Sequence, residues 1–253
     1  KRKGKKSDMT YHPTDRRLLI SVIIPIYSEH ESLWELHSRL KKVFHKLTHR
    51  YRHELIFVND GSKDCSLDIL MELLQKDQTV IILDLARNFG HQSAITAGID
   101  SATGDALIVM DGDLQDPPEV IPEMIEKWES GFDVVYGTRK SRDGENAIKQ
   151  FLASAFYRLI NLLSETPLPN DSGDFKLINR SVANVIKELR EESRYLRGLI
   201  SWVGFSQTPL QYDRDSRFAG HTKFPFVKML KFGLDGITSF STGPLVLSMI
   251  LGV

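Results

Sequence analysis

The stretch LLISVIIPI, which runs from Leu18 to Ile26, is a continuous apolar segment rich in β-branched residues. A strand that is buried on both faces has this pattern, because neither face meets water. From Ser32 to Leu47 the apolar residues recur at helical spacing, with Ser32 as a candidate N-cap. A buried strand followed directly by an amphipathic helix predicts the first unit of an α/β sheet.

The same alternation of strands and helices continues along the first half of the chain. Apolar runs predict further strands over residues 54–60, 80–86, 106–111 and 132–139. Helical spacing predicts helices over residues 66–75, 91–101 and 118–130. The pattern therefore predicts an α/β fold with a mostly parallel sheet flanked by helices, and ligands of such sheets bind at the carboxyl ends of the strands.

The second half of the chain loses this alternation. Residues 147–163 and 181–189 have helical spacing, 206–212 resembles a short strand, and the segment 164–181, rich in Pro, Asp, Ser and Gly, is predicted to be a loop. From Pro225 onward, an apolar face broken by a few charges is typical of a helix at a membrane surface. The final run, residues 240–253, is shorter than the roughly 20 apolar residues that span a bilayer, and we expect it to open a transmembrane helix. The alternative is that this run forms the last helix of the protein core.

These patterns divide the chain into a basic tail over residues 1–17, a globular domain over 18–223 and a helical segment over 224–253. The tail begins KRKGKKSDM and has no apolar run behind it, so it is not a secretory signal. A flexible segment that touches anionic lipid and an expression remnant are both compatible with it.

Composition excludes several classes of function. The 253 residues are 41% hydrophobic and 26% charged, which is ordinary for a globular domain with a substantial core. Basic and acidic residues number 33 each, so the net charge of zero gives no indication of a nucleic-acid partner. The single cysteine, Cys65, excludes an internal disulfide and a thiolate metal site.

Polar residues, with one glycine among them, lie at or just after the end of every predicted strand of the first half. They are Tyr27 and Glu29; Asp60, Gly61 and Ser62; Arg87 and Asn88; Asp111, Asp113 and Gln115; and Arg139 and Arg142. Because the carboxyl ends of parallel strands meet at one edge of a sheet, we expect these residues to converge on one cleft.

The acidic segment VMDGDLQDPPE, residues 109–119, is a candidate metal site. Asp111 and Asp113 flank a glycine that permits a tight turn, and Gln115 adds a neutral oxygen. Mg²⁺ is usually bound by one or two carboxylates together with substrate phosphates. The turn is therefore predicted to hold Mg²⁺ or Mn²⁺, with a solvated surface turn as the alternative. Asp116 is instead predicted to lie at the start of helix 118–130, where the helix dipole favours a carboxylate.

The turn DGSKD, from Asp60 to Asp64, is predicted to start a helix and to bind a ligand. Ser62 or Asp64 is expected to cap helix 66–75. Asp60 is then left to accept hydrogen bonds from a ligand such as a base or a ribose hydroxyl. An EF-hand is excluded, because the alternating ligands and terminal glutamate of that loop are absent.

Six segments in this order, SVIIPIYSE, FVNDGSKD, RNFGHQSAITAG, VMDGDLQDPPE, VVYGTR and SGDFKLINR, resemble the family 2 glycosyltransferases that transfer a sugar to a polyisoprenyl phosphate. The resemblance runs from Leu18 to the C-terminus. It is greatest to the dolichol-phosphate mannose synthases and, more narrowly, to the GtrB-type bactoprenol glucosyltransferases. Ser28 departs from the usual asparagine, and GHTK, from Gly220 to Lys223, departs from the more frequent Gly-Glu-Ser-Lys. The resemblance implies a GT-A fold for residues 18–223.

The resemblance also implies roles at the matching positions. The uridine of a nucleotide sugar would be held by Pro25, Tyr27, Glu29 and Asp60. The divalent cation on its diphosphate would be held by Asp111, Asp113 and Gln115. The lipid phosphate would be received by Arg139, Arg142, Lys149 and Ser154. The pyrophosphate would be covered by Arg217 and Lys223.

Asp113 and Asp174 are the catalytic candidates. A phosphate acceptor is already ionised near neutrality, so the site needs positioning and cationic side chains more than a strong base. One in-line displacement predicts inversion at the anomeric carbon. Asp174, in the segment SGDF, would face the acceptor as a base or as an aligner of the phosphate. A loop residue that caps the following segment is the alternative. His91 and His221 could touch phosphate, but isolated loop histidines are usually solvated.

Together with the resemblance, these features lead us to expect a metal-dependent inverting hexosyltransferase, and the resemblance implies that it moves glucose from UDP-glucose to undecaprenyl phosphate. It would act at the bacterial plasma membrane, with its catalytic domain on the cytoplasmic face, as a homo-oligomer and without a nucleic-acid partner. GDP-mannose or another nucleotide sugar, a soluble saccharide acceptor, and a non-catalytic nucleotide-sugar-binding membrane scaffold are the alternatives.

Overall fold

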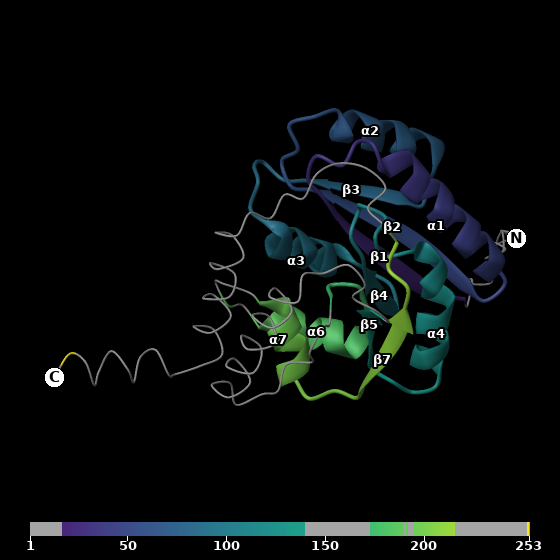
Figure 1. Ribbon diagram of the computed structural model, residues 1–253, viewed down its shortest axis with the longest axis vertical. Coiled ribbons are helices and arrows are strands. Elements are labelled where there is room, and N and C mark those ends of the chain that lie inside the picture. The colour runs from purple at the N-terminus through teal and green to yellow at the C-terminus, as the bar shows by residue number, and fades with distance from the viewer. Residues whose placement is uncertain (1–16, 140–172, 190, 192–194, 216–251, 253) are drawn as a thin grey trace, which may run out of the picture.

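The fold is built on a seven-stranded sheet in the order β3-β2-β1-β4-β6-β5-β7 (Figure 1). The computed structural model describes residues 17–139, 173–189, 191, 195–215 and 252. The strands are β1 (Leu18–Ile26), β2 (Tyr51–Asn59), β3 (Val80–Asp84), β4 (Ala106–Val109), β5 (Val134–Arg139), β6 (Lys176–Asn179) and β7 (Gln207–Tyr212). The helices are α1 (Leu33–Leu47), α2 (Ser66–Lys76), α3 (His91–Ser101), the 3₁₀ turn η1 (Pro118–Val120), α4 (Ile121–Glu129), α6 (Arg180–Glu188) and α7 (Leu196–Trp202).

Alternate residues of the central strands face opposite layers of helices. In β1, Val22 and Ile24 join the core formed with α1, α2 and α4, whereas Ile23 joins the core formed with α3, α6 and α7. Figure 1 shows α1 and α4 on one side of the sheet and α3, α6 and α7 on the other. Because helices cover both faces, the central strands are apolar throughout. The predicted α/β fold with a mostly parallel sheet is confirmed.

The strand β6 runs antiparallel between β4 and β5, whereas the other neighbouring strands are parallel. The prediction of a loop over residues 164–181 is therefore wrong for Lys176–Asn179. A four-residue run is too short to show a periodicity, and its pairing partners are distant in the sequence. Lys176 pairs with Val109 and with Tyr136, so the amino end of β6 lies at the carboxyl end of β4 and beside the middle of β5.

The helix α7 was also not predicted, because seven residues make only two turns. The other elements agree with prediction to within a few residues, and β1 and α3 have the predicted bounds. The strand β4 ends at Val109, so Asp111 lies in the turn that follows. Helix 118–130 is divided into η1 and α4.

Several predicted features lie outside the described residues. They are helix 147–163, the segment 224–253 apart from residue 252, and Arg142, Lys149, Ser154, Arg217, His221 and Lys223. Over the part of the chain that the structure describes, we find no helix with both the length and the apolar character needed to cross a membrane.

Candidate active site

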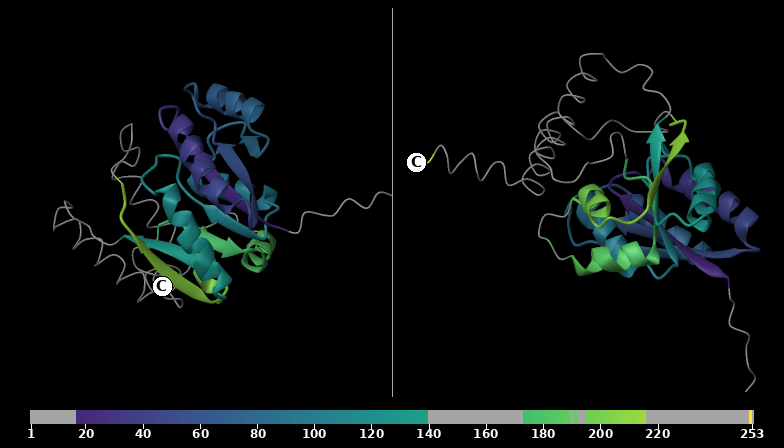
Figure 2. Two further views of the ribbon diagram at one scale, coloured as in Figure 1. Left: turned by 90° about the vertical axis from the view of Figure 1, so that its right-hand side faces the viewer. Right: turned by 90° about the horizontal axis from the view of Figure 1, so that it is seen from below.

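One edge of the sheet collects the carboxyl ends of β1, β2, β3, β4, β5 and β7. Figure 2 shows β5 and β7 running side by side towards this edge. The antiparallel β6 adds its amino end to the same edge. The polar residues that follow β1 to β4 therefore lie at one edge, together with Arg139, the last residue of β5.

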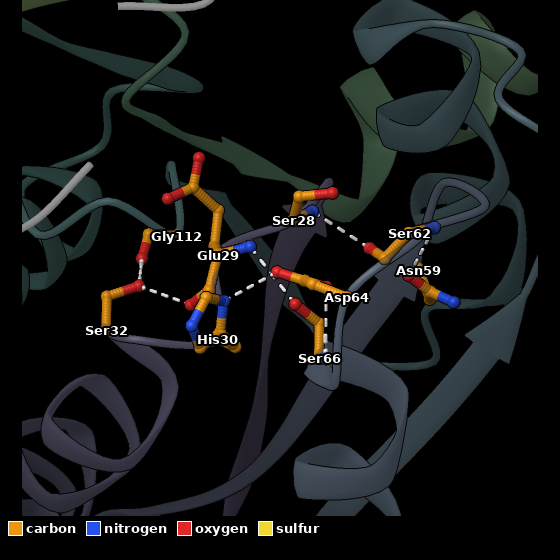
Figure 3. Close-up of polar contacts among 9 residues, drawn as sticks. All are labelled: Ser28, Glu29, His30, Ser32, Asn59, Ser62, Asp64, Ser66 and Gly112. Atoms are coloured by element: carbon orange, nitrogen blue, oxygen red, sulfur yellow. Dashed lines mark hydrogen bonds and ion pairs between the residues drawn. The ribbon is translucent and has the colours of Figure 1, made fainter. Parts of the chain in front are cut away.

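The turns after β1 and β2 are joined by hydrogen bonds (Figure 3). The backbone N–H groups of Ser28 and Glu29 donate to the hydroxyls of Ser62 and Ser66 at 2.9 and 3.1 Å. The carboxylate of Glu29 points away from this network. The turn that carries the candidate nucleotide residues Tyr27 and Glu29 is therefore held in place by β2 and α2.

The capping prediction for α2 is wrong in detail, because the N-cap residue is Cys65. Ser62 instead accepts a hydrogen bond from the first turn, as described above. Asp64 Oδ1 accepts from the N–H of Ser66 at 3.1 Å, and Asp64 Oδ2 lies 2.7 Å from His30 Nδ1. Both residues thus connect the two turns.

Ser28 has a φ of 55°, which lies in the left-handed region. Asparagine adopts this conformation more readily than serine does. Related sequences usually have asparagine at this position, and the backbone conformation also favours asparagine here. The hydrogen bond that Ser28 donates to Ser62 stabilises the turn with serine in place.

Asp60 is not left open in the way that the sequence suggested. It is buried, and its carboxylate accepts hydrogen bonds from the Asn88 amide and from the N–H groups of Phe89 and Gly90, at 2.9, 2.7 and 3.0 Å. A Cβ at Gly61, whose φ is 64°, would lie 2.6 Å from the backbone of this loop. Asp60 therefore fixes the loop that leads into α3, and its contact with a nucleotide stays a prediction.

The acidic turn after β4 is held by its neighbours. The carbonyl of Gly112 accepts a hydrogen bond from the Ser32 hydroxyl at 2.6 Å. Asp113 is buried, and its Oδ1 accepts from the N–H of Gln115 at 3.1 Å. These hydrogen bonds thus fix the backbone of the turn that bears the carboxylates of Asp111 and Asp113.

Asp111 has an unusual electrostatic environment. Its Oδ1 is buried and accepts no hydrogen bond from any residue in the described part of the chain. Burial raises the pKa of Asp111 to about 6; the charge of His91 opposes the rise, and the carboxylates of Asp116, Asp174 and Asp113 add to it. A bound cation would relieve this repulsion.

Asp116 is set apart from the other acids, but not by the start of the following helix. Its Oδ1 accepts a hydrogen bond from the Tyr212 hydroxyl and lies 3.5 Å from Arg214 Nε. The N–H of Asp215 donates to the carbonyl of Gln115 at 3.1 Å. Asp116 therefore helps to connect the acidic turn to the end of β7.

Asp174 lies at the centre of a group of ion pairs and is 8% exposed. Arg197, on α7, donates from Nε to Asp174 Oδ1 and from Nη2 to Asp174 Oδ2, both at 2.7 Å. Nε2 of His91, the first residue of α3, lies 3.1 Å from Asp174 Oδ2 and 3.5 Å from Asp111 Oδ1. One imidazole nitrogen therefore links Asp174 to the acidic turn.

These contacts set the charge of each group. Burial alone would raise the pKa of Asp174, but the charge and hydrogen bonds of Arg197, with those of His91, hold it well below its usual range. Burial disfavours the imidazolium of His91, yet the hydrogen bond to Asp174 and the charge of Asp111 raise its pKa to about 9. Burial lowers the pKa of the nearby Lys176 to about 8, although Asp174 opposes this.

Sequence analysis missed Arg197 and Lys176, and the expectation that His91 is merely solvated is wrong. Arg197 lies on α7, a helix that was not predicted. Lys176 and Asp174 are two positions apart, so in a strand they would point to the same side. This signal was available only if Lys176–Asn179 had been predicted as a strand.

The acidic turn fits a divalent cation. Asp111, Asp113 and Gln115 offer oxygen ligands within one turn, and a buried oxygen of Asp111 lacks a hydrogen bond within the described residues. Among those residues no group of three or more His, Cys, Asp or Glu side chains could hold a metal ion by itself. Substrate phosphate would have to supply further ligands, as it usually does for Mg²⁺.

A family model described as glycosyl transferase family 2 matches residues 21–186. This match covers more than half of the chain. The chain belongs to glycosyl transferase family 2. It is therefore a glycosyltransferase, and the resemblance expected from its sequence motifs is confirmed.

Relatives of this family 2 glycosyltransferase are similar over most of its length. The glycosyltransferase YkcC of Bacillus subtilis is 50% identical over 238 residues, which cover 94% of this chain and 73% of the relative. A prophage bactoprenol glucosyl transferase homolog of Escherichia coli is 41% identical over 234 residues, which cover 92% and 76%.

Solved structures agree on the fold. The mannosyltransferase PcManGT from Pyrobaculum calidifontis, in complex with GDP-Man and Mn²⁺, matches with a TM-score of 0.56 at 15% identity, over 78% of this chain and 56% of that one. TarS 1–349 of S. aureus matches with a TM-score of 0.54 at 18% identity, over 76% and 58%. The expected GT-A type of fold is confirmed.

Proposed function

We propose that this glycosyltransferase transfers a hexose, glucose in the first instance, from a UDP-sugar to the phosphate of a membrane polyprenyl phosphate. The reaction would invert the anomeric carbon and depend on a divalent cation. The observation that carries the proposal is the acidic turn, in which Asp111 and Asp113 lie at the edge where the strands end. Relatives named bactoprenol glucosyl transferase support the choice of acceptor.

In this proposal, Asp111, Asp113 and Gln115 hold Mg²⁺ or Mn²⁺. The cation, when bound, offsets the charge that develops on the departing nucleoside diphosphate. The hydrogen bond from Ser32 to Gly112 holds the turn in place before substrate arrives. The ligands therefore need little rearrangement on binding, which lowers the cost of reaching the reactive geometry.

The nucleotide would bind beside the turn after β1. Pro25 lies near the end of β1, and Tyr27 and Glu29 follow it in the turn that β2 and α2 hold in place. We propose that these three residues contact the uridine. Asp60 would act with them mainly by fixing the loop at Asn88 to Gly90.

The acceptor phosphate would approach from the ends of β5 and β6. A phosphate monoester has a second pKa of about 6 and is already a nucleophile at neutral pH, so it needs cations and alignment more than a base. Arg139 ends β5 at this edge. We propose that Arg139 receives the phosphate with Arg142, Lys149 and Ser154, and that Arg217 and Lys223 cover the pyrophosphate.

We also propose an arrangement at the membrane. The catalytic domain, residues 18–223, would lie on the cytoplasmic face of a bacterial plasma membrane. Residues 224–253 would form an interfacial helix and the start of a transmembrane helix. The basic run at residues 1–17 is compatible with contact with anionic lipid, and the enzyme would act as a homo-oligomer.

The test is a transfer assay with labelled UDP-glucose, undecaprenyl phosphate and Mg²⁺. We expect label in an organic-extractable lipid, loss of the signal with EDTA, and recovery when excess Mg²⁺ or Mn²⁺ is added. Transfer that persists in EDTA would remove the metal from the proposal.

The same assay separates the alternatives. Lipid labelling only from GDP-mannose or another nucleotide sugar would change the donor. Label that appears only in a water-soluble saccharide would change the acceptor. Metal-dependent UDP binding without transfer to any acceptor would favour a non-catalytic scaffold.

A further inference from the structure

The sequence left two roles for Asp174, a base towards the acceptor or an aligner of its phosphate, and the structure bears on both. Arg197 donates to each oxygen of Asp174 at 2.7 Å, and His91 Nε2 lies 3.1 Å from Oδ2. Asp174 lies two residues before β6, His91 begins α3, and Arg197 lies on α7. None of the three contacts joins residues that are neighbours in the sequence.

Such a carboxylate is a poor proton acceptor. Hydrogen bonds to the ionised form stabilise it, so a carboxylate that accepts two or three of them loses much of its basicity. The two parallel bonds from the Arg197 guanidinium also fix the plane of the carboxylate. The depressed pKa of Asp174 agrees with this geometry. Because a phosphate acceptor is already ionised, the reaction does not require a base at this position.

A fixed anion is equally unsuited to bind phosphate directly, since like charges repel. It is well suited to accept a hydrogen bond from a hydroxyl group. His91 Nε2 lies 3.1 Å from Asp174 and 3.5 Å from Asp111, so only this imidazole separates Asp174 from the acidic turn. In the proposed function this turn faces the diphosphate, and the sugar is bonded to that diphosphate. The hydroxyls of the sugar are therefore the donors within reach.

We propose that Asp174 is a fixed hydrogen-bond acceptor for a hydroxyl of the transferred hexose, and that Arg197 is the positioning residue that holds it. This role rests on the proposed function and deepens it, because it assigns a sugar-recognising group to the site. Arg197 and His91 occupy three of the roughly four acceptor sites of this carboxylate, which leaves one direction from which a hydroxyl can donate. The pair therefore selects the hexose by the position and stereochemistry of that hydroxyl.

The first test combines donor analogues with substitutions at Asp174. UDP-glucose and its 2-, 3-, 4- and 6-deoxy analogues are compared with the wild-type enzyme, Asp174→Ala and Asp174→Asn, using kcat/KM for transfer to undecaprenyl phosphate. One deoxy donor should lose about 10- to 100-fold with the wild-type enzyme, the range of a hydrogen bond to a charged group. Asp174→Ala should lose a similar factor with UDP-glucose and nothing further with that deoxy donor.

Additive losses would overturn the proposal. If Asp174→Ala lowers kcat/KM by the same factor with every donor, Asp174 does not contact a sugar hydroxyl. Should Asp174→Ala not fold, as judged by thermal melting, the same comparison is made with Asp174→Asn, which keeps the shape and loses the charge. In that case a smaller but still donor-dependent loss is expected, and a uniform loss contradicts the proposal.

The second test addresses Arg197. Arg197→Ala should reduce the preference for UDP-glucose over the critical deoxy analogue, and Arg197→Lys should restore part of it. Arg180→Ala is the matched control, because Arg180 donates to the backbone carbonyls of Ala102 and Gly104. This control should lower the melting temperature without changing the preference. Full preference in Arg197→Ala would show that Arg197 does not position Asp174.

The outcomes separate this role from the proposed function. No transfer from any nucleotide sugar would overturn the proposed function and this role together. Transfer from UDP-glucose with additive losses would overturn only the role of Asp174. If another donor is the substrate, the deoxy analogues of that donor are used in the same design.

Discussion

Two clusters of histidine, aspartate and lysine lie at opposite edges of one sheet. The carboxyl-edge cluster comprises His91, Asp111, Asp174, Lys176 and Arg197, as described above. The amino-edge cluster comprises His37, Lys41, His53, Asp77 and Thr79. In the latter, Asp77 accepts from His37 Nε2 at 2.8 Å, from Lys41 Nζ at 3.0 Å, and from the N–H and hydroxyl of Thr79 at 3.0 and 2.8 Å.

The same residue types have opposite electrostatics at the two edges. At the amino edge, Asp77 accepts hydrogen bonds from Thr79, His37 and Lys41. Burial lowers the pKa of His53 there to about 4. At the carboxyl edge, the pKa of Asp111 rises to about 6 and that of His91 to about 9. In the first cluster the neighbours of the Asp77 carboxylate supply its hydrogen bonds without a ligand, whereas the second gathers carboxylates in excess of what its neighbours satisfy within the described residues. Perturbed groups of the second kind are typical of functional sites.

The largest expected effect is on activity at the carboxyl edge. Asp113→Asn should lower kcat at least about 100-fold at saturating Mg²⁺, because a metal ion stabilises transition-state charge by several kcal/mol and each 1.4 kcal/mol is tenfold. Its melting temperature should change little. Initial rates across a Mg²⁺ titration check this, and near-normal turnover would remove Asp113 from the metal site.

The reverse pattern is expected at the amino edge. Asp77→Ala leaves partly buried donors of His37 and Thr79 without their acceptor, so the free energy of unfolding should fall by about 1–3 kcal/mol. The folded enzyme should keep its kcat. Chemical denaturation and an assay below the melting transition test both statements. A loss of kcat comparable to that of Asp113→Asn would abolish the contrast between the edges.

Asp116 tests whether the acidic turn combines metal ligands with a carboxylate whose role is only structural. Asp116→Asn keeps an acceptor for Tyr212 but removes the charge beside Arg214. We expect a stability loss of about 1–2 kcal/mol, typical of weakening a buried charged contact, and a fall in kcat of less than about tenfold. Thermal melting and initial rates check these values. An effect on kcat as large as that of Asp113→Asn would place Asp116 with the metal ligands.

The smallest effect concerns pH. The folded pKa of His53, about 4, lies below its unfolded value of about 6.5, so the unfolded state takes up the proton first as pH falls. Stability is therefore lost below about pH 6.5 until the folded group also titrates. His53→Phe, which keeps a ring beside Phe44, should lose about 1–2 kcal/mol less than the wild type between about pH 7 and about pH 5. Denaturation at the two pH values gives the difference, and equal losses would contradict the assignment.

Local sequence patterns predicted the strands and helices whose burial leaves a pattern in consecutive residues. The bounds of β1 and α3 agree with the structure, because a strand covered on both faces leaves a continuous apolar run and a helix with one apolar face leaves apolar residues at helical spacing. The acidic turn after β4 could be found in the same way, since its ligand types lie within five residues. The strand β6 and the helix α7 were too short to leave such a pattern.

The site around Asp174 could not be assembled from the sequence. His91 is 83 residues from Asp174 and Arg197 is 23 residues from it, and only folding brings the three together. The same applies to Asp60, whose partners lie 28 to 30 residues further along the chain. Hydrogen bonds between distant residues impose no spacing rule that a linear pattern could show.

The sequence by itself determined the α/β class, the edge of the sheet at which the candidate site residues gather, the acidic turn and the likeness to polyprenyl-phosphate glycosyltransferases. These follow from periodicity and from residues close together in the chain. Only the tertiary structure decided that β6 is reversed, that Asp60 holds a loop, and that Arg197 and His91 bind Asp174. The physical reason is that the charge and orientation of a buried group depend on every partner that folding brings to it.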